Sequence, residues 1–328
     1  MDNYQQVVHQ MEEFGVVWAA KDLPLQIDAP KRKGCGKAGK WWYWLRSWRP
    51  DAGGCFVVGR YGSYKTGESR KVLVDWRPLA DAERLRMSAE RAAAKLRADQ
   101  ARQREAELAA LGAADLWRRA ARTGHSPYLE RKGVTPEACR YLPDGSIVVP
   151  LLRYDMPRAE ALRGVQRILP DGSKRFTKGF AKSGCALRLG EARPGYVVLV
   201  CEGYATGLTL RMATDHQLAV YVALDAGNLA HVVPIVRQLH PDCRVLICAD
   251  DDYRTRNQAG ELANTGRTAA RAIARQVVGC DIVWPAFPRP RGPKDTDFND
   301  LQQLQGLATV QRQLAGVLQA MKAHYTHD

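Results

Sequence analysis

The 328-residue sequence lacks three features that would each assign it to a particular class of protein. Its first residues, MDNYQQVVHQMEEFGVVW, contain no basic segment followed by an apolar one, so we expect no signal peptide. No apolar run approaches the roughly 20 residues of a membrane-spanning helix. The eight cysteines form no CxxC pair, which argues against a zinc ribbon and favours reduced thiols. We therefore expect a cytoplasmic protein with no membrane partner.

Acidic residues are also scarce. The chain has 35 Asp and Glu against 49 Lys and Arg, which gives a formal net charge of +14. Such an imbalance bears on what the protein associates with and not on its fold, and it indicates a polyanionic partner. Nucleic acid is a better candidate than an acidic membrane surface.

Residues 1–78 are expected to form a small, mostly β unit, because the runs KWWYWLRSW and GCFVVGRYGSY are aromatic and β-branched with glycines between them. Lys31–Arg77 contains twelve Lys and Arg but three Asp and Glu. Trp41, Trp42 and Trp44 lie within this stretch, and aromatic rings among cations suit single-stranded nucleic acid. The alternative is that alternate rings fill a small core and the cations are only solvated.

Two segments separate this unit from the rest. Residues 79–122 are rich in Ala, Glu, Arg, Leu and Gln and lack proline after Pro78, which predicts a long helical linker. Residues 123–194 are expected to form a small basic α+β subdomain with two strands, a turn at Asp171-Gly172 and a further short strand. Within it, Arg153–Arg188 contains nine Lys and Arg but three Asp and Glu.

Residues 195–300 alternate apolar runs with helical stretches, which predicts a Rossmann-like α/β domain with a parallel sheet covered on both faces. The expected strands are 196–201, 218–224, 244–249 and 281–286, and the expected helices are 204–213, 228–239 and 259–278. Residues 301–328 are expected to contain one amphipathic helix that packs on the sheet.

Acidic residues follow three of these runs. Right-handed crossovers place the carboxyl ends of parallel strands on one edge, where ligands of open α/β sheets bind. Carboxylates gathered there select Mg²⁺ or Mn²⁺. The alternative is that each acid caps the helix that follows it. The acidic residues are Glu202, then Asp250, Asp251 and Asp252, then Asp295, Asp297 and Asp300.

Several motifs resemble a known family. CEGYATG, ADDD and DTDFNDL look like the Glu-Gly, Asp-x-Asp and trailing acidic signatures of Toprim domains, the fold shared by topoisomerases and bacterial-type primases. HSPYLERKGV, LRGVQRILPDGSKRF and DFNDL are similar to segments of the primases of conjugative plasmids and phages. The resemblance covers residues 123–301 well and the N-terminal unit only loosely.

The resemblance implies roles for particular residues. It makes Glu202 a general acid/base or an additional metal ligand, and Asp250 and Asp252 the ligands of Mg²⁺. It lets Gly203 turn the backbone tightly beside phosphates. The trailing acids Asp297 and Asp300 complete the implied metal set.

The resemblance also implies a basic wall that faces nucleoside triphosphate and template. In this sequence the wall maps onto Arg163, Gln166, Arg167, Lys174 and Arg175, and a further cation of the matching motif is Lys132. The chain departs from the bacterial replicative primase because it lacks the N-terminal zinc-binding module and a helicase segment. Template selection is therefore expected to depend on the Trp-rich unit, on a replicative helicase or on another replication protein.

The function implied is a DNA primase, a DNA-directed RNA polymerase that makes short RNA primers on single-stranded DNA for a plasmid, phage or other mobile element. Three alternatives stay open: a Toprim nuclease that uses the same acids to cut DNA, a phosphatase of the haloacid-dehalogenase type, and a non-catalytic single-strand binder. The phosphatase is disfavoured because its aspartate motif normally follows the first strand of the fold, whereas DDDYRT follows the third expected strand.

Overall fold

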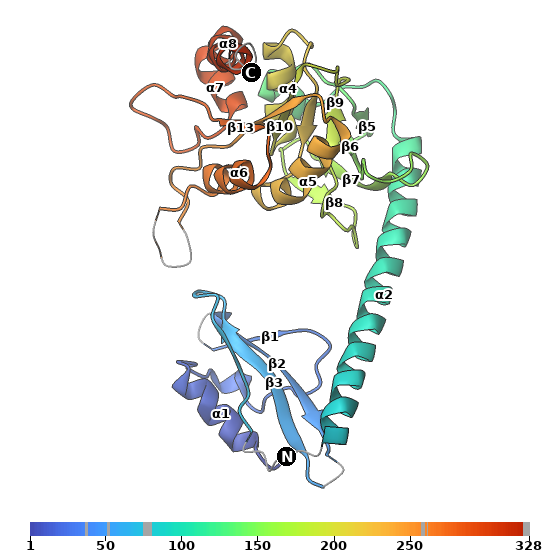
Figure 1. Cartoon of the computed structure of the whole chain (residues 1–328), viewed down its shortest axis with the longest axis vertical. Coiled ribbons are helices and arrows are strands. Elements are labelled where there is room, and N and C mark those ends of the chain that lie inside the picture. The colour runs from blue at the N-terminus through green and yellow to red at the C-terminus, as the bar shows by residue number, and fades with distance from the viewer. Residues whose placement is uncertain (37–38, 51–52, 75–80, 257–259, 261, 324–328) are drawn as a thin grey trace. The chain divides into compact units, whose positions relative to one another are not determined.

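The computed structural model describes residues 1–36, 39–50, 53–74, 81–256, 260 and 262–323 (Figure 1). The chain divides into two compact units: unit 1 is Met1–Ala98 with Arg256–Glu261, and unit 2 is Asp99–Thr255 with Leu262–Asp328. None of the helices in the described part of the chain combines the length and the apolarity that a membrane span requires.

Unit 1 is a four-stranded antiparallel sheet with a helix against one face. The expected aromatic strands are present, and the sheet follows chain order, β1-β2-β3-β4. Val7 and Met11 of the helix pack against Tyr43 and Leu45 of β2 in one buried cluster. The elements are α1 (Tyr4–Glu13), a 3-10 turn (Ala20–Asp22), β1 (Lys33–Cys35), β2 (Trp41–Trp48), β3 (Phe56–Ser63) and β4 (Ser69–Lys71).

The predicted helical linker is α2 (Asp81–Arg119); residues 79 and 80 of that prediction lie outside the described residues. Its C-terminal part does more than link two units, because Ala106, Ala109 and Ala113 are buried. Ala113 packs with Val148 and Val165 of the sheet that follows. Alanines suffice for this contact because their small side chains let the helix approach the sheet closely.

Unit 2 contains two sheets. The first is antiparallel, in the order β5-β6-β7-β8, and includes the expected turn, where Gly172 has a φ of +91° that favours glycine. Its elements are α3 (Pro127–Lys132), β5 (Arg140–Tyr141), β6 (Ile147–Leu152), β7 (Leu162–Ile168) and β8 (Lys174–Phe176).

The second sheet has the order β13-β12-β10-β11-β9, and all neighbours are parallel except β9, which is antiparallel to β11. The expected α/β fold is thus confirmed. Its strands are β9 (Leu187–Leu189), β10 (Val197–Cys201), β11 (Val220–Val222), β12 (Arg244–Cys248) and β13 (Cys280–Val283). Its helices are α4 (Tyr204–Ala213), α5 (Ala226–Leu239), α6 (Thr265–Gln276), α7 (Phe298–Gln305) and α8 (Leu307–Ala323).

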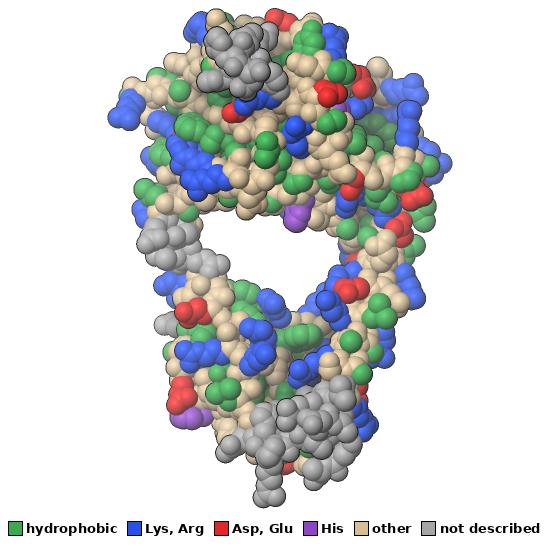
Figure 2. Space-filling view, in the orientation of Figure 1, with side chains coloured by type: hydrophobic (Ala, Val, Ile, Leu, Met, Phe, Trp, Pro, Cys, Tyr) green, Lys and Arg blue, Asp and Glu red, His purple; other side chains and the backbone are tan. Residues whose placement is uncertain are grey.

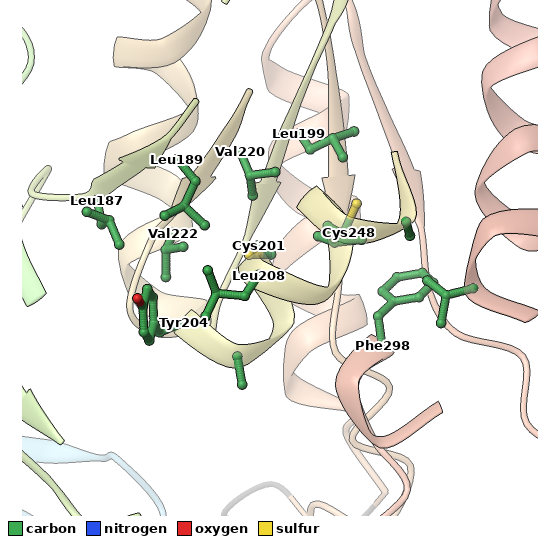
Figure 3. Close-up of a cluster of buried hydrophobic side chains, with 14 of the residues drawn as sticks. Leu187, Leu189, Leu199, Cys201, Tyr204, Leu208, Val220, Val222, Cys248 and Phe298 are labelled. Atoms are coloured by element: carbon green, nitrogen blue, oxygen red, sulfur yellow. The ribbon is translucent and has the colours of Figure 1, made fainter. Parts of the chain in front are cut away.

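Strand alternation divides this sheet into two buried faces. Leu199 and Cys201 of β10 join one cluster, whereas Val198 and Val200 join another. Figure 3 shows the first face, where side chains of β9–β12 lie near helices α4 and α7. Residues of α5 and α6 cover the second face. Helices on both faces explain why the strands are continuous apolar runs.

The C-terminal segment differs from its prediction. Instead of one helix after residue 301, α7 ends at Gln305 and α8 begins at Leu307. Gly306 between them has a φ of +80°, which interrupts the helix. Val310 and Leu314 of α8 belong to the first buried cluster, and α8 contacts α4 and α7.

Candidate active site

The carboxyl ends of β10 and β12 lie side by side, and an acidic residue follows each strand. The two strands pair in parallel, with Cys201 opposite Cys248 at the end of the register. The structure therefore brings Glu202 and Asp250 together at one edge of the sheet. The two strands that follow β10 in the chain, β11 and β12, lie on opposite sides of it, and open α/β sheets place their ligands at such a switch in strand order.

Glu202 is buried and Asp250 is half-buried, and each has one buried oxygen without a partner within the described residues. Glu202 is 8% exposed, and Glu202 Oε1 and Asp250 Oδ1 have no hydrogen-bond partner within the described residues. Burial, reinforced by the charge of Asp252, raises the pKa of Glu202 to about 7. Burial and the charge of Glu202 raise the pKa of Asp250 well above its ordinary value. Burial and mutual repulsion therefore favour a proton or a cation at this pair.

Gly266, in the first turn of α6, packs directly on this pair. A Cβ at this position would lie 2.4 Å from the backbone oxygen of Asp250 and 2.8 Å from Glu202 Oε1. The amide of Gly266 donates to Asp252 Oδ2 at 3.3 Å. Only glycine fits here, and its close approach places the positive end of the helix dipole beside Asp252.

Asp251, the middle aspartate, is neutralised by cations of the protein. Its carboxylate accepts hydrogen bonds from Asn264 (2.6 Å), Arg267 (3.2 Å) and Arg291 (2.5 Å). Burial alone would raise the pKa of Asp251, but these hydrogen bonds outweigh it and lower the pKa. Of the three consecutive aspartates, this one is held by the protein's own side chains.

Arg291 ties the loop after β12 to the loop before α7. Its guanidinium donates to the Asp251 carboxylate and backbone oxygen, and its Nε donates to the backbone oxygen of Asp295 at 2.7 Å. The amide of Asp251 also donates to the backbone oxygen of Thr296 at 2.7 Å. These contacts hold the segment that carries Asp250 against the segment that carries Asp297.

Asp297 and Asp300 form a capping box at the start of α7. Asp297 accepts from the amide of Asp300 at 2.8 Å, and Asp300 accepts from the amide of Asp297 at 3.2 Å. Thr206 of α4 donates to Asp297 Oδ2 at 3.0 Å. Burial and the charge of Asp300 raise the pKa of Asp297. The helix-cap alternative thus describes these two residues, although both also act electrostatically on Asp250.

A basic pocket of about 240 Å³ adjoins the acidic edge. Lys132, Lys174 and Gly203, which the sequence assigned separately to nucleotide binding, all line it, and Lys132 Nζ lies 3.6 Å from Asp300 Oδ1. The remaining lining residues are Tyr128, Arg131, Asp171, Gly172, Ala205, Thr206 and Asp297. The cavity therefore combines three cations with the amino-terminal end of α4.

The other residues of the expected basic wall do not share this pocket. Strand register places Arg167 opposite Arg175 on one face of the sheet, whereas Lys174 lies opposite Ile168 on the other. Arg163 is on the first face with Arg167 and is bound to Glu107 of α2 at 2.6 Å. Arg167 is paired with Asp144, and Gln166 is 3% exposed. The expected basic wall is therefore split between the two faces of the sheet, because successive side chains of a strand point to opposite faces.

The three tryptophans that the sequence assigned to template binding are likewise separated. Trp41 lies on the side of Tyr43 and Leu45 and packs against the core of unit 1. Trp42 and Trp44 lie on the opposite face; Trp42 is 8% exposed and Trp44 is 43% exposed. Of the three, Trp44 alone presents a large part of its ring to solvent.

The acidic edge fits a divalent cation in its chemistry. Within the described residues, no three His, Cys, Asp or Glu side chains are arranged to hold a metal as they lie. Two buried carboxylate oxygens without partners are nevertheless hard-oxygen donors of the kind that Mg²⁺ prefers. Mg²⁺ commonly takes one or two carboxylates and completes its shell with water and substrate phosphate, so a full cage is not required.

The sequence reasoning missed three residues of this region. Arg131 and Thr206 reach the pocket from α3 and α4, and Asp225 adds negative charge near Glu202. Asp225 follows β11 as the other acids follow their strands, and that position could have identified it. Arg131 and Thr206 belong to the motifs quoted above. The sequence of those motifs does not reveal which of their side chains face the pocket.

Comparison with known proteins agrees with the motifs. Residues 197–308 match the family model of the Toprim domain. The chain is 34% identical over 242 residues to the DNA primase TraC of Escherichia coli, covering 70% of this chain and 21% of that protein. A second DNA primase TraC of Escherichia coli is 33% identical over 167 residues, covering 49% and 11%. The chain thus spans about a fifth, or less, of the length of these relatives.

Among solved structures, the primase fragment of the bacteriophage T7 primase-helicase protein is similar at 13% identity, with a TM-score of 0.38 over 57% of this chain and 68% of that one. The chain contains a Toprim domain, and its expected resemblance to Toprim DNA primases of plasmid type is confirmed.

Proposed function

We propose that this Toprim-containing chain is a DNA primase, which synthesises short RNA primers on single-stranded DNA for a plasmid, phage or other mobile element. One observation carries the proposal: Glu202 and Asp250, each with a buried oxygen lacking a described partner, stand beside a pocket lined by three cations. A nucleotidyl transferase needs this combination, because its acidic side chains bind the metal ion and its cationic side chains bind the triphosphate.

Asp250 and Asp252 are the proposed ligands of Mg²⁺ or Mn²⁺. When bound, the metal would neutralise charge on the attacking and leaving oxygens of the phosphoryl transfer. Asp297 and Asp300 already accept hydrogen bonds from the first turn of α7, so we assign them a supporting electrostatic role. Asp251 is excluded from the ligand set because Arg267 and Arg291 already neutralise it.

The remaining chemistry falls to residues of the chain itself. Glu202, with a pKa of about 7, is suited to accept the proton of the attacking 3′-hydroxyl near neutral pH. Arg131 and Lys174, which form no salt bridge within the described residues, would bind the triphosphate of the incoming nucleotide beside Lys132, which is paired with Asp300. The backbone at Gly203 would let the triphosphate approach α4.

The proposed template site lies on unit 1, on the sheet face that carries Trp42 and Trp44. A replicative helicase or another replication protein would supply the single strand in the cytoplasm. Arg163 and Arg167 are left out of the template site because Glu107 and Asp144 already neutralise them.

Incubation of the full-length protein with single-stranded DNA, labelled ribonucleotides and Mg²⁺ tests the proposal. We expect short labelled RNA products that disappear with EDTA and with Asp250→Asn, but not with Asp215→Asn, an exposed aspartate. Cleavage of the template without synthesis would instead identify a nuclease. Binding without either reaction would identify a single-strand binder.

A further inference from the structure

A second polar cavity, of about 360 Å³, lies in unit 1. Strand register places Trp42 beside Gly62, and Gly62 beside Ser69, on the sheet face opposite Tyr43 and Leu45. The lining residues are Arg32, Trp42, Arg60, Ser63, Tyr64, Gly67 and Ser69. Its volume falls in the range of small-molecule sites, and two arginines and two rings surround it.

Trp42 forms the floor of this cavity and is not free to stack on a base. A Cβ at Gly62 would lie 2.8 Å from the Trp42 ring, so the ring rests on the Gly62 backbone. The guanidinium of Arg32 covers the ring at 4.2 Å from its centroid. Trp42 therefore orients Arg32.

Tyr64 supplies the accessible ring of the cavity. It is 51% exposed, and its centroid lies 6.4 Å from that of Trp42, with the planes tilted by 47°. The turn that carries it is fixed, because Ser63 Oγ accepts hydrogen bonds from the amides of Lys65 and Thr66. Its ring is thus held at the cavity with a large exposed area.

The cavity is positively charged without compensation. No acidic residue lines it, and no salt bridge joins Arg32 or Arg60 to a carboxylate in the described part of the chain. Arg60 is held by Ser69, to whose hydroxyl it donates at 3.0 Å. Figure 2 shows Lys and Arg side chains among hydrophobic ones on the visible face of unit 1.

We propose that this cavity binds one unstacked nucleotide of single-stranded DNA. Arg32 and Arg60 hold its phosphate, and its base stacks on Tyr64. The strand is identified as template only through the proposed primase function, but the cavity itself is inferred from unit 1 alone. A free nucleotide carries the same phosphate and base as a nucleotide within a strand, so the test below compares the two ligands.

The test uses the full-length protein and a fluorescent oligothymidylate, with affinity measured by anisotropy at several salt concentrations. We expect Tyr64→Ala to weaken binding by roughly five- to hundredfold, the effect of losing one stacked base, and Tyr64→Phe to retain it. Tyr196→Ala, which removes a tyrosine of similar exposure from unit 2, is the matched control. Arg60→Gln should lower the log–log salt slope by about 0.7, whereas Lys65→Gln, beside the cavity, should not.

Two further arms identify the ligand. On a strand of abasic sites, wild type and Tyr64→Ala should bind equally, because the base that stacks is absent. Thymidine monophosphate should compete weakly; efficient competition would show that a free nucleotide is the ligand and would overturn the strand assignment. Wild-type affinity in both Tyr64→Ala and Arg60→Gln would overturn the site itself. Primer synthesis is assayed separately, so loss of the primase proposal would not be mistaken for loss of this site.

Discussion

Two regions of the chain have a similar excess of basic residues but very different surroundings. Between Lys31 and Lys71, no Lys or Arg forms a salt bridge within the described part of unit 1. In unit 2, cations from several elements have carboxylate partners. These pairs include Arg153–Asp155, Arg163–Glu107, Arg167–Asp144, Lys182–Asp225, Arg188–Glu191, Arg211–Glu137 and Arg291–Asp251.

The difference arises from acids supplied by other segments. Arg153–Arg188 contains three acidic residues of its own, yet Arg163 finds Glu107 on α2 and Arg167 finds Asp144 before β6. Unit 1 also has acids, but Asp22 and Asp28 accept hydrogen bonds from backbone amides and from the Ser47 hydroxyl instead of pairing with these cations. A positive charge is available to a polyanion only when no carboxylate already holds it, so the unpaired cations of unit 1 are better placed to bind a strand.

Removing an acid from unit 2 should sharpen the comparison most. We expect Asp250→Asn to lower primer synthesis at least roughly a hundredfold, since even residues that only support metal ligands cost 10- to 100-fold when mutated. Single-strand affinity should not change, because the cations of unit 1 are untouched. Synthesis rates and anisotropy titrations of this variant and Asp215→Asn decide it; substantial synthesis by Asp250→Asn would contradict the metal assignment.

The sequence predicted the regions with strong local signals. Four apolar runs became β10, β11, β12 and β13, because strands covered on both faces must be continuously apolar. The edge acids Glu202 and Asp250 followed from parallel topology alone. Contacts between distant segments were not predictable in this way. Arg291 and Asp251 lie 40 residues apart, and no local pattern indicates that one holds the other.

The same limit explains the misplaced cations and rings. The composition of a stretch of sequence gives the number of Lys and Arg but not which acids of other segments pair with them. Arg163 was therefore expected to be free to bind nucleic acid. Alternation of side chains along a strand predicts that Trp41 and Trp42 point to opposite faces of the sheet. A run of consecutive aromatic residues does not reveal which of the two faces the core. The break at Gly306 could have been anticipated, since glycine commonly ends a helix.

The second prediction concerns the pair that links two loops of the acidic edge. Arg291→Gln should destabilise unit 2 by about 3 kcal/mol, because it leaves a buried carboxylate short of its strongest partner. Synthesis should also fall, and added guanidinium should partly restore it. Arg271→Gln is the matched control. Arg271 covers the Trp284 ring as Arg291 covers the Tyr253 and Phe287 rings, but of the two arginines only Arg291 pairs with Asp251. Urea unfolding measures stability; equal values for both variants would mean that the link is dispensable.

The third prediction uses the titration of Glu202 in metal-free protein. Its pKa is about 7 in the folded chain and near 4.5 without burial, so the folded state binds more protons between these values. Stability should therefore fall as pH rises from about 4.5 to 7. Relative to wild type, Glu202→Gln should gain on the order of 3 kcal/mol at pH 8 and little at pH 5. Urea unfolding in EDTA at each pH measures this; a difference independent of pH would contradict the buried, proton-sharing pair.

The last prediction tests the comparison itself with two variants of equal charge. Arg60→Gln with Lys71→Gln in unit 1, and Arg153→Gln with Arg188→Gln in unit 2, each lower the formal charge of +14 by two. Arg60 and Lys71 lie opposite each other across β3 and β4 and are exposed, whereas Arg153 and Arg188 are ion-paired. If both cations of the first variant contact phosphates, the log–log salt slope should fall by about 1.4, at 0.7 per contact.

The unit 2 variant should change the slope by much less, because its two arginines are already neutralised and salt screens the remaining field within about 8 Å. Anisotropy titrations of both variants with the same oligothymidylate, across one salt series, measure the two slopes directly. Equal slopes would mean that net charge alone governs binding and that the unpaired cations of unit 1 have no special role. A larger loss in unit 2 would place the template on unit 2, where the motif resemblance implied a basic wall for nucleotide and template.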